Sequence, residues 1–159
     1  MNKTIMTGGL LLLGALMISQ RKLQLYKDQP RGIRNNNPLN IRENAQTDYE
    51  WQGERSTNDD AAFEEFIDPI YGIRAGARVL KSYRRRGIVT LADIVTTWAP
   101  PTENNTSSYI GSVAAATGLD RWTEIQEHHY PDLIAAMIHH ENGIQPYSME
   151  LIKAGVTMA

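Results

Sequence analysis

Hydrophobic residues recur three and four positions apart through most of the second half of the chain, which is the period of an α-helix. In the first of these segments Ile70, Ile73 and Ala77 share one face, and Gly87 provides a stop signal. The pattern predicts helices from Ile70 to Arg86, from Thr90 to Trp98, from near Thr106 to Gly118, from Tyr130 to His140 and from Ser148 to Met158. The segment from Tyr49 to Phe66 instead suits a small β hairpin with a polar tip. The sequence therefore predicts a mainly α fold (α+β) with a small β hairpin.

The first part of the chain has a different pattern. The stretch from Thr4 to Gln20 carries no charge, and it is flanked by Lys3 on one side and by Arg21 and Lys22 on the other. As a helix it would extend roughly 25 Å, slightly less than a hydrocarbon core of about 30 Å, and basic flanks can reach the lipid headgroups. We therefore expect a hydrophobic helix that anchors the chain in a membrane. The expected organisation is a membrane anchor over 1–21, a linker over 22–30 and a folded domain over 31–159.

Two other interpretations of this first segment stay open. A cleaved signal peptide would share the basic start and the apolar run, but no small-x-small cleavage site follows the run. A buried core helix would normally keep a polar face, whereas this segment is apolar on all sides. The positive charges on both flanks leave the orientation across a membrane undecided.

Composition narrows the chemistry that the folded domain can perform. The 159 residues carry a formal net charge of −2, whereas a nucleic-acid-binding domain is normally clearly basic, so no nucleic-acid partner is expected. The absence of cysteine excludes disulfides and thiol catalysis. His139 and His140 are adjacent and point to different faces of a helix, and no His-Glu-x-x-His motif is present. We therefore expect neither a metal site nor a cofactor, and catalysis would depend on carboxylates, hydroxyls or histidines.

Glu141 is the most informative of these candidates. It follows Ile134, Met137 and Ile138 at spacings of three and four, so it continues the buried stripe of its own helix, and Gly143 then ends that helix. Partial burial and the negative end of the helix dipole both favour the neutral acid over its anion. Cleavage of a glycosidic bond needs such an acid, because the leaving oxygen must receive a proton. The structural alternative is a buried glutamate satisfied by backbone groups or by an arginine.

Three blocks of sequence resemble the lysozyme-like superfamily. Glu141-Asn142-Gly143, at the end of an apolar helix and followed by Pro146, resembles the catalytic helix of lytic transglycosylases, in which Glu-Ser-Gly is usual. The block 36–42 (Asn-Asn-Pro-Leu-Asn-Ile-Arg) is similar to the Asn-Asn-Leu-Phe-Gly-Ile-Lys region of flagellar-type glucosaminidases. The block 98–104 (Trp-Ala-Pro-Pro-Thr-Glu-Asn), with Tyr109 after it, resembles the Glu-Thr-x-x-Tyr-Val block of transglycosylases.

The resemblance covers nearly all of 31–159. Over this full extent the sequence is similar to phage virion-associated lytic proteins. It implies a lysozyme-like helical domain. In those relatives the glutamate helix precedes the Asn-Asn block, whereas here it follows that block by about a hundred residues. The resemblance therefore implies a circularly permuted domain, which is physically reasonable because domain termini usually lie close together at the surface.

The resemblance also implies roles for residues outside the glutamate helix. A transglycosylase needs a single carboxylate, with Glu141 acting first as acid and then as base, whereas a hydrolase needs a second one. Glu54 and Asp60 are the preferred candidates for a second catalytic carboxylate, by analogy with the hairpin carboxylate of the glucosaminidases. Residues that could hydrogen-bond sugars or an acyl-amino group, and so bind substrate, are Asn37, Asn40, Tyr109 and Tyr147. Each of these tyrosines is equally compatible with a place in the core.

The expected function is cleavage of the β-1,4 glycosidic bonds of peptidoglycan, in the manner of a phage-type lytic transglycosylase or muramidase. Expected partners are glycan strands, a membrane contacted through the N-terminal helix, and other virion proteins, in a virion membrane or the bacterial cell envelope. Two alternatives keep the fold without the chemistry: a membrane-anchored structural protein of a virion, and a module that binds peptidoglycan. Glu141 distinguishes the enzyme from the two alternatives, because only the enzyme requires this residue. Which glycosidic bond is cut, and whether water or an internal hydroxyl attacks it, stays open.

Overall fold

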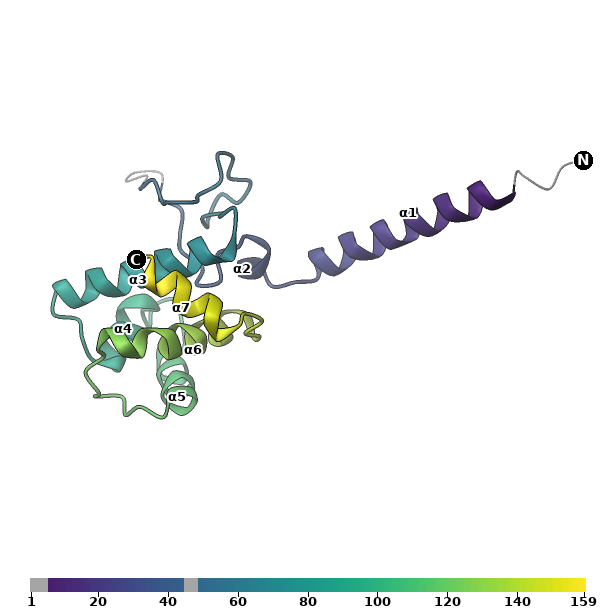
Figure 1. Cartoon of the computed structure of the whole chain (residues 1–159). Coiled ribbons are helices and arrows are strands. Elements are labelled where there is room, and N and C mark those ends of the chain that lie inside the picture. Colours follow the sequence, from purple (N-terminus) through teal and green to yellow (C-terminus); the bar gives the residue numbers. More distant parts are fainter. Residues whose placement is uncertain (1–5, 45–48) are drawn as a thin grey trace, which may run out of the picture. The chain divides into compact units, whose positions relative to one another are not determined.

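The computed structural model describes residues 6–44 and 49–159, with side chains described from residue 17 onward. The chain divides into two compact units, Met1–Pro30 and Arg31–Ala159. Helix α1, Met6–Lys27, lies in the first unit, and the other described helices belong to the second (Figure 1).

Helix α1 differs from the expected anchor and linker. Within the described part of the chain, no helix combines the length and the hydropathy that crossing a membrane requires. The helix does not end with the apolar stretch but continues through Gln20, Arg21 and Lys22 as far as Lys27. Most of the expected linker over 22–30 is therefore helical, because its residues are good helix formers until Pro30.

The second unit is mainly helical, as the hydrophobic period predicts. Its helices are α2 (Arg31–Arg34), α3 (Pro69–Arg85), α4 (Leu91–Trp98), α5 (Thr106–Thr117), the short 3-10 helix η1 (Glu127–His129), α6 (Tyr130–Asn142) and α7 (Met149–Thr157). The five longer helices confirm the predicted ones with ends shifted by no more than two residues. Side chains that accept a hydrogen bond from the first turn explain four of the starts: Asp68 before α3, Thr90 before α4, Asn105 before α5 and Ser148 before α7.

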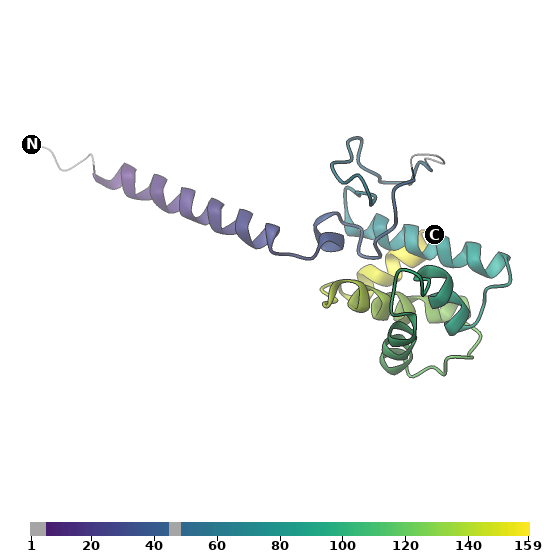
Figure 2. The ribbon, with the colours of Figure 1, turned by 180° about the vertical axis from the view of Figure 1, so that it is seen from behind.

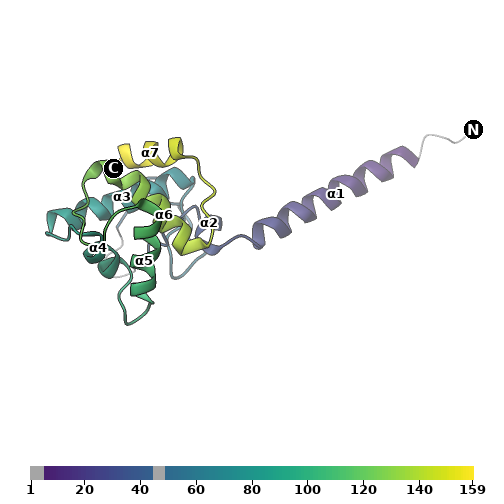
Figure 3. The ribbon, with the colours of Figure 1, turned by 90° about the horizontal axis from the view of Figure 1, so that it is seen from below.

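Helix α6 forms the centre of this unit. Its residues Leu133, Ile134, Met137 and Ile138 are fully buried. It packs against α3, α5 and α7, and Figure 3 shows it between α5 and α7. Most of the described residues 35–44 and 49–68, which form the irregular segment, lie on one side of α3, and α4 to α6 lie on the other side (Figures 1 and 2).

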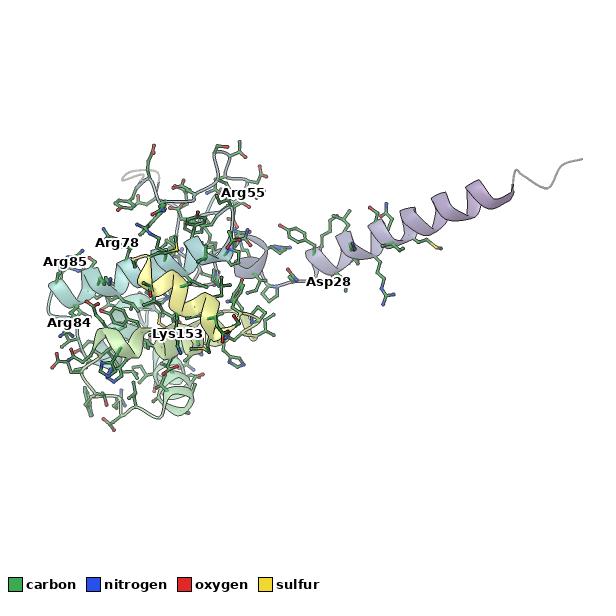
Figure 4. The ribbon with its side chains drawn as sticks, viewed as in Figure 1. Asp28, Arg55, Arg78, Arg84, Arg85 and Lys153 are labelled. Atoms are coloured by element: carbon green, nitrogen blue, oxygen red, sulfur yellow. The ribbon has the colours of Figure 1, made fainter. Side chains whose placement is uncertain are left out.

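Arg84 at the end of α3 holds a neighbouring segment in place. Arg84 and Arg85 are labelled at this end of the helix in Figure 4. Arg84 donates to the carbonyl of Ile125 at 2.8 Å and to Oε1 of Gln126 at 2.9 Å. These hydrogen bonds link α3 to the segment that leads into α6. The positive charge of Arg84 also interacts favourably with the dipole at the C-terminus of α3.

The predicted β hairpin is wrong for the described residues between α2 and α3. These residues form the isolated bridges Arg42–Phe63 and Glu54–Phe66, and no continuous ladder joins them. Polar side chains satisfy backbone groups that a ladder would otherwise pair. The carboxylate of Asp60 accepts from the amides of Ala62 and Phe63, and Oε2 of Glu65 accepts from the amide of Asp59 at 2.8 Å.

Gly72 allows α3 to approach the irregular segment closely. A Cβ atom at this position would lie 2.2 Å from the carbonyl oxygen of Asn36 and 2.8 Å from Cδ of Pro38. We expect Gly72→Ala to lower the free energy of unfolding by about 1–3 kcal/mol, because the backbone of Asn36 must move.

Gly111 in α5 is a matched control, because a Cβ atom there meets no heavy atom within 4 Å. Gly111→Ala should leave stability unchanged or raise it by up to about 1 kcal/mol through helix propensity. Urea unfolding of both variants measures the difference, and equal effects of the two would contradict the close packing of α3.

Candidate active site

The carboxylate of Glu141 is held by three hydrogen-bond donors from three different parts of the chain. Nδ2 of Asn40 donates to Oε2 at 2.9 Å, the hydroxyl of Tyr109 donates to Oε1 at 2.9 Å, and Nε1 of Trp98 donates to Oε1 at 3.2 Å. Asn40 follows α2, Trp98 ends α4, Tyr109 lies in α5 and Glu141 lies in the last turn of α6. Three segments that are distant in sequence therefore meet at one half-buried acid.

The end of α6 is fixed to the irregular segment beside it. Gly143 ends the helix with φ of 70°, in the left-handed region that glycine adopts without a Cβ penalty. Nδ2 of Asn142 donates to the carbonyl of Pro38 at 2.8 Å and to that of Ile138 at 2.9 Å. Its Oδ1 atom is buried without a hydrogen-bond partner. Asn142 therefore ties the helix end directly to the residues that precede Asn40.

Asn40 reaches Glu141 from an unusual backbone conformation. Its φ is 50°, which asparagine tolerates better than most residues, and its amide nitrogen donates to the carbonyl of Asn37 at 2.9 Å. The tight turn directs its side chain toward the end of α6. The proximity of Asn40 to Glu141 is consistent with the predicted place at a substrate site, and binding of substrate by Asn40 stays a prediction.

Asn37 has a different place from the one that sequence reasoning gave it. It is fully buried, so it cannot touch a ligand at the surface. Its Oδ1 accepts from the amide of Ile41, and its Nδ2 donates to the carbonyls of Ile41 and Glu64, each at 2.9 Å. The side chain therefore replaces missing backbone pairing within the irregular segment, and its predicted contact with sugar is corrected to a structural one.

Tyr109 is a neutral hydrogen-bonding partner of Glu141. Burial raises the pKa of its phenol, and the charge of Glu141 and the hydrogen bond to it raise that pKa further. One face of its ring stacks on His140, with the ring centroids 3.8 Å apart. A phenol that stays neutral can donate a hydrogen bond to a carboxylate or accept one from a carboxylic acid. Tyr109 can therefore serve Glu141 in both of its protonation states.

Trp98 is the member of this site that sequence reasoning missed. Its indole meets the ring of Tyr83 edge-on, with the ring centroids 6.4 Å apart. Its N–H group nevertheless points at Glu141. The sequence feature that could have indicated this role is the position of Trp98 at the start of the Trp-Ala-Pro-Pro block, where α4 ends before the connection to α5.

Tyr147 does not join the contacts of Glu141. Its hydroxyl is buried without a hydrogen-bond partner, and its ring packs against the core. Burial raises the pKa of the phenol to about 12, and the charge of Asp68 adds to this effect. Its predicted role in binding sugar is therefore corrected to packing, because a hydroxyl enclosed by the protein cannot reach a ligand.

The two carboxylates predicted as a second catalytic group lie in other surroundings. Asp60 forms an ion pair with Arg31 and accepts a hydrogen bond from Nδ2 of Asn35 at 2.7 Å. Glu54 accepts a hydrogen bond from the amide of Trp51 at 2.9 Å and lies in a cluster with Glu43 and Glu64.

Within residues 17–44 and 49–159, the donors that contact Glu141 form no hydrogen bond with the carboxylate of Asp60 or of Glu54. The cluster around Glu54 is also the part of the described chain where oxygen ligands for a metal ion come together.

A comparison with known proteins places the chain in a family. Over 126 residues it is 46% identical to Protein P5 of Pseudoalteromonas phage PM2, and the match covers 79% of each protein. The chain belongs to the family of Protein P5. No family model matches the sequence. This relative is a bacteriophage protein.

The ion pair of Asp60 predicts an acid-dependent stability. Burial alone would raise the pKa of this carboxyl, but hydrogen bonds from Arg31, Ala62 and Asn35 outweigh burial and lower it to about 2. A lowered pKa stabilises the fold above the unfolded value of 3.8, and that contribution is lost as the pH falls toward 2. We expect Asp60→Asn to lose about 1–2 kcal/mol at neutral pH and to show a flatter decline between pH 4 and 2.

Asp59→Asn is the matched control. The side chain of Asp59 is next to Asp60 in the sequence and is exposed, so this substitution should change the pH profile of stability little. Urea unfolding at several pH values measures both variants. Profiles of the same shape for Asp60→Asn and the unmodified protein would show that the ion pair does not stabilise the fold.

Proposed function

We propose that this protein cleaves β-1,4 glycosidic bonds in the glycan strands of peptidoglycan, with Glu141 as the catalytic acid. The observation that carries the proposal is the meeting of Asn40, Trp98 and Tyr109 at this one carboxylate. Asn40 comes from the block that resembles glucosaminidases, and Trp98 and Tyr109 come from a block that resembles transglycosylases. Glu141 belongs to the third block, so donors from two of the resembling blocks meet at the glutamate of the third.

The proposed chemistry uses Glu141 alone, and its described hydrogen-bond partners are all neutral side chains. In the first step Glu141 gives its proton to the glycosidic oxygen, the bond from that oxygen to C1 breaks, and positive charge develops at C1. In the second step the 6-hydroxyl oxygen of the muramic residue bonds to C1, and its proton passes to the carboxylate of Glu141. The products are a free 4-hydroxyl on one sugar and a 1,6-anhydro ring on the other, and Glu141 is returned to its acid form.

The single-carboxylate mechanism is favoured over hydrolysis by the positions of the other candidates. A hydrolase would need a second carboxylate near Glu141 to activate water or to act as nucleophile. Asp60 is engaged by Arg31, and Glu54 belongs to the separate cluster. Tyr109 can accept and return a hydrogen bond as Glu141 changes its protonation state. A lytic transglycosylase therefore fits these contacts better than a two-carboxylate enzyme.

The setting that we propose is a virion, where such an activity would open the cell wall of a host. The support is the family relationship to a phage protein. We further propose that the N-terminal helix associates the chain with a virion membrane or with the cell envelope, on the basis of the apolar run before Gln20.

Digestion of purified peptidoglycan, with the products identified by mass spectrometry, tests the activity. The unmodified chain should release fragments with 1,6-anhydromuramic ends. Glu141→Gln should reduce the rate by at least about a hundredfold, because it removes the transferable proton while keeping an acceptor for Trp98 and Tyr109. Fragments with reducing ends instead would mean hydrolysis.

Glu150→Gln is the control, because Glu150 is exposed in the first turn of α7 and should leave the rate unchanged. Circular dichroism should show that both variants remain folded. Full activity in Glu141→Gln would remove this residue from the mechanism, and no products from the unmodified folded chain would favour a structural or glycan-binding role.

Vesicle flotation tests the proposed membrane association. The full chain should rise with phospholipid vesicles in a density gradient, and a chain without residues 1–30 should stay at the bottom, because the apolar segment lies in the first compact unit. A full chain that stays at the bottom would refute membrane association through this segment.

A further inference from the structure

Three glutamates of the irregular segment bring their carboxylates together. The ligand oxygens of Glu43, Glu54 and Glu64 all lie within 4.8 Å of one another. Glu43 and Glu54 are half-buried, whereas Glu64 is only 3% exposed. Three like charges at such separations repel one another strongly, so the arrangement needs a compensating positive charge or a proton.

Glu64 carries the observation that points to a ligand. Its Oε2 atom is buried and has no hydrogen-bond partner. A buried charged oxygen without a partner costs more free energy than almost any other single defect in a protein interior. Arg55 is the basic residue nearest to Glu64 in the sequence, and it forms an ion pair with Glu65 rather than with the cluster. Figure 4 shows Arg55 in the irregular segment.

The other two carboxylates are already oriented by hydrogen bonds from neighbouring groups. Oε2 of Glu43 accepts from Nδ2 of Asn58 at 2.7 Å, and Oε2 of Glu54 accepts from the amide of Trp51 at 2.9 Å. Each carboxylate keeps a second oxygen for another contact. Outer hydrogen bonds of this kind are a regular feature of carboxylates that ligate metal ions.

We propose that Glu43, Glu54 and Glu64 bind a calcium ion. The donors are all carboxylate oxygens, which hard cations prefer, and nitrogen or sulfur ligands that would favour zinc are not part of the cluster. Oxygens bound to one Ca²⁺ lie up to about 5 Å apart, since each lies about 2.3–2.6 Å from the ion. Octahedral Mg²⁺ limits this separation to about 4.2 Å, so the upper bound of 4.8 Å in the cluster is compatible with the larger ion.

The ion would hold together the segment that leads to the candidate active site. The backbone amide of Glu64 donates to the carbonyl of Ile41 at 3.0 Å, and its carbonyl accepts from Asn37. Asn37 and Ile41 flank Asn40, which contacts Glu141. The cluster therefore joins both ends of the irregular segment close to this contact, and calcium binding would stabilise the fold whether or not the protein is an enzyme.

A proton is the competing occupant of the cluster. In the absence of an ion, burial raises the pKa of Glu64 to about 8, and the charges of Glu43 and Glu54 contribute to the increase. Calcium would displace this proton, because a ligating carboxylate must be ionised. A calcium site predicts stabilisation by added calcium at neutral pH, whereas a cluster that holds only a proton predicts none.

Thermal unfolding and terbium luminescence of the full chain distinguish these occupants. At constant ionic strength, 5–10 mM Ca²⁺ should raise the midpoint of unfolding by about 5 °C, and the same concentration of Mg²⁺ should raise it less. Tb³⁺, which replaces Ca²⁺ at oxygen sites, should show luminescence sensitised by Trp51 and lost on addition of Ca²⁺. Glu54→Gln and Glu64→Gln should each weaken binding at least about tenfold.

Glu50→Gln supplies the matched control, because it removes one charge from an exposed position in the same segment. This variant should bind calcium like the unmodified chain. If Glu64→Gln does not fold, Glu54→Gln carries the comparison, since Glu54 is half-buried. The proposal is overturned if calcium does not raise the unfolding midpoint, if Mg²⁺ acts as strongly as Ca²⁺, or if Glu50→Gln and Glu54→Gln weaken binding equally.

Discussion

The side-chain amide of Asn37 fixes the part of the chain on which the candidate site depends. The described residues 35–44 and 49–68 form isolated bridges rather than a continuous strand ladder, so their backbone groups need other partners. Asn37 satisfies three of them at once, on Ile41 and Glu64, and it does so where water is excluded. Because these bonds surround Asn40, they determine where its side chain meets Glu141. The loss of one buried amide would therefore disturb both the packing of this segment and the hydrogen bonding of the acid.

Close packing of backbone against side chains gives this arrangement its second support. A Cβ atom on Gly32 would lie 2.6 Å from Oδ1 of both Asn40 and Asn142. Glycine at this position therefore leaves room for the two asparagines that connect the irregular segment to the end of α6. Asn142 holds Pro38, and Asn40 holds Glu141, so the same small space fixes the helix end and its acid. The position of Glu141 follows from these contacts as much as from its own helix.

The helices could be predicted from sequence because each one buries a continuous apolar stripe, and periodicity records burial directly. The place of Glu141 at the end of α6 could be predicted because it continues such a stripe. The structure of the irregular segment could not be predicted in the same way. The sequence does not reveal whether a polar residue such as Asn37 or Asp60 faces solvent, pairs with an arginine or hydrogen-bonds to buried backbone groups. Tyr147 and Trp98 show the same limit for aromatic residues, because only the fold decides which polar edge finds a partner.

Three carboxylates of this protein illustrate how the surroundings determine what an acid can do. Asp60 is paired with a permanent cation, so it cannot accept a proton at neutral pH without breaking that pair. Glu64 is surrounded by like charges, so it needs a proton or a cation to remain buried. Glu141 is bound by neutral donors, one of which can reverse its hydrogen bond. Among these three carboxylates, Glu141 is therefore the one whose described hydrogen-bond partners are all neutral side chains, which is the environment that the proposed acid–base role would use.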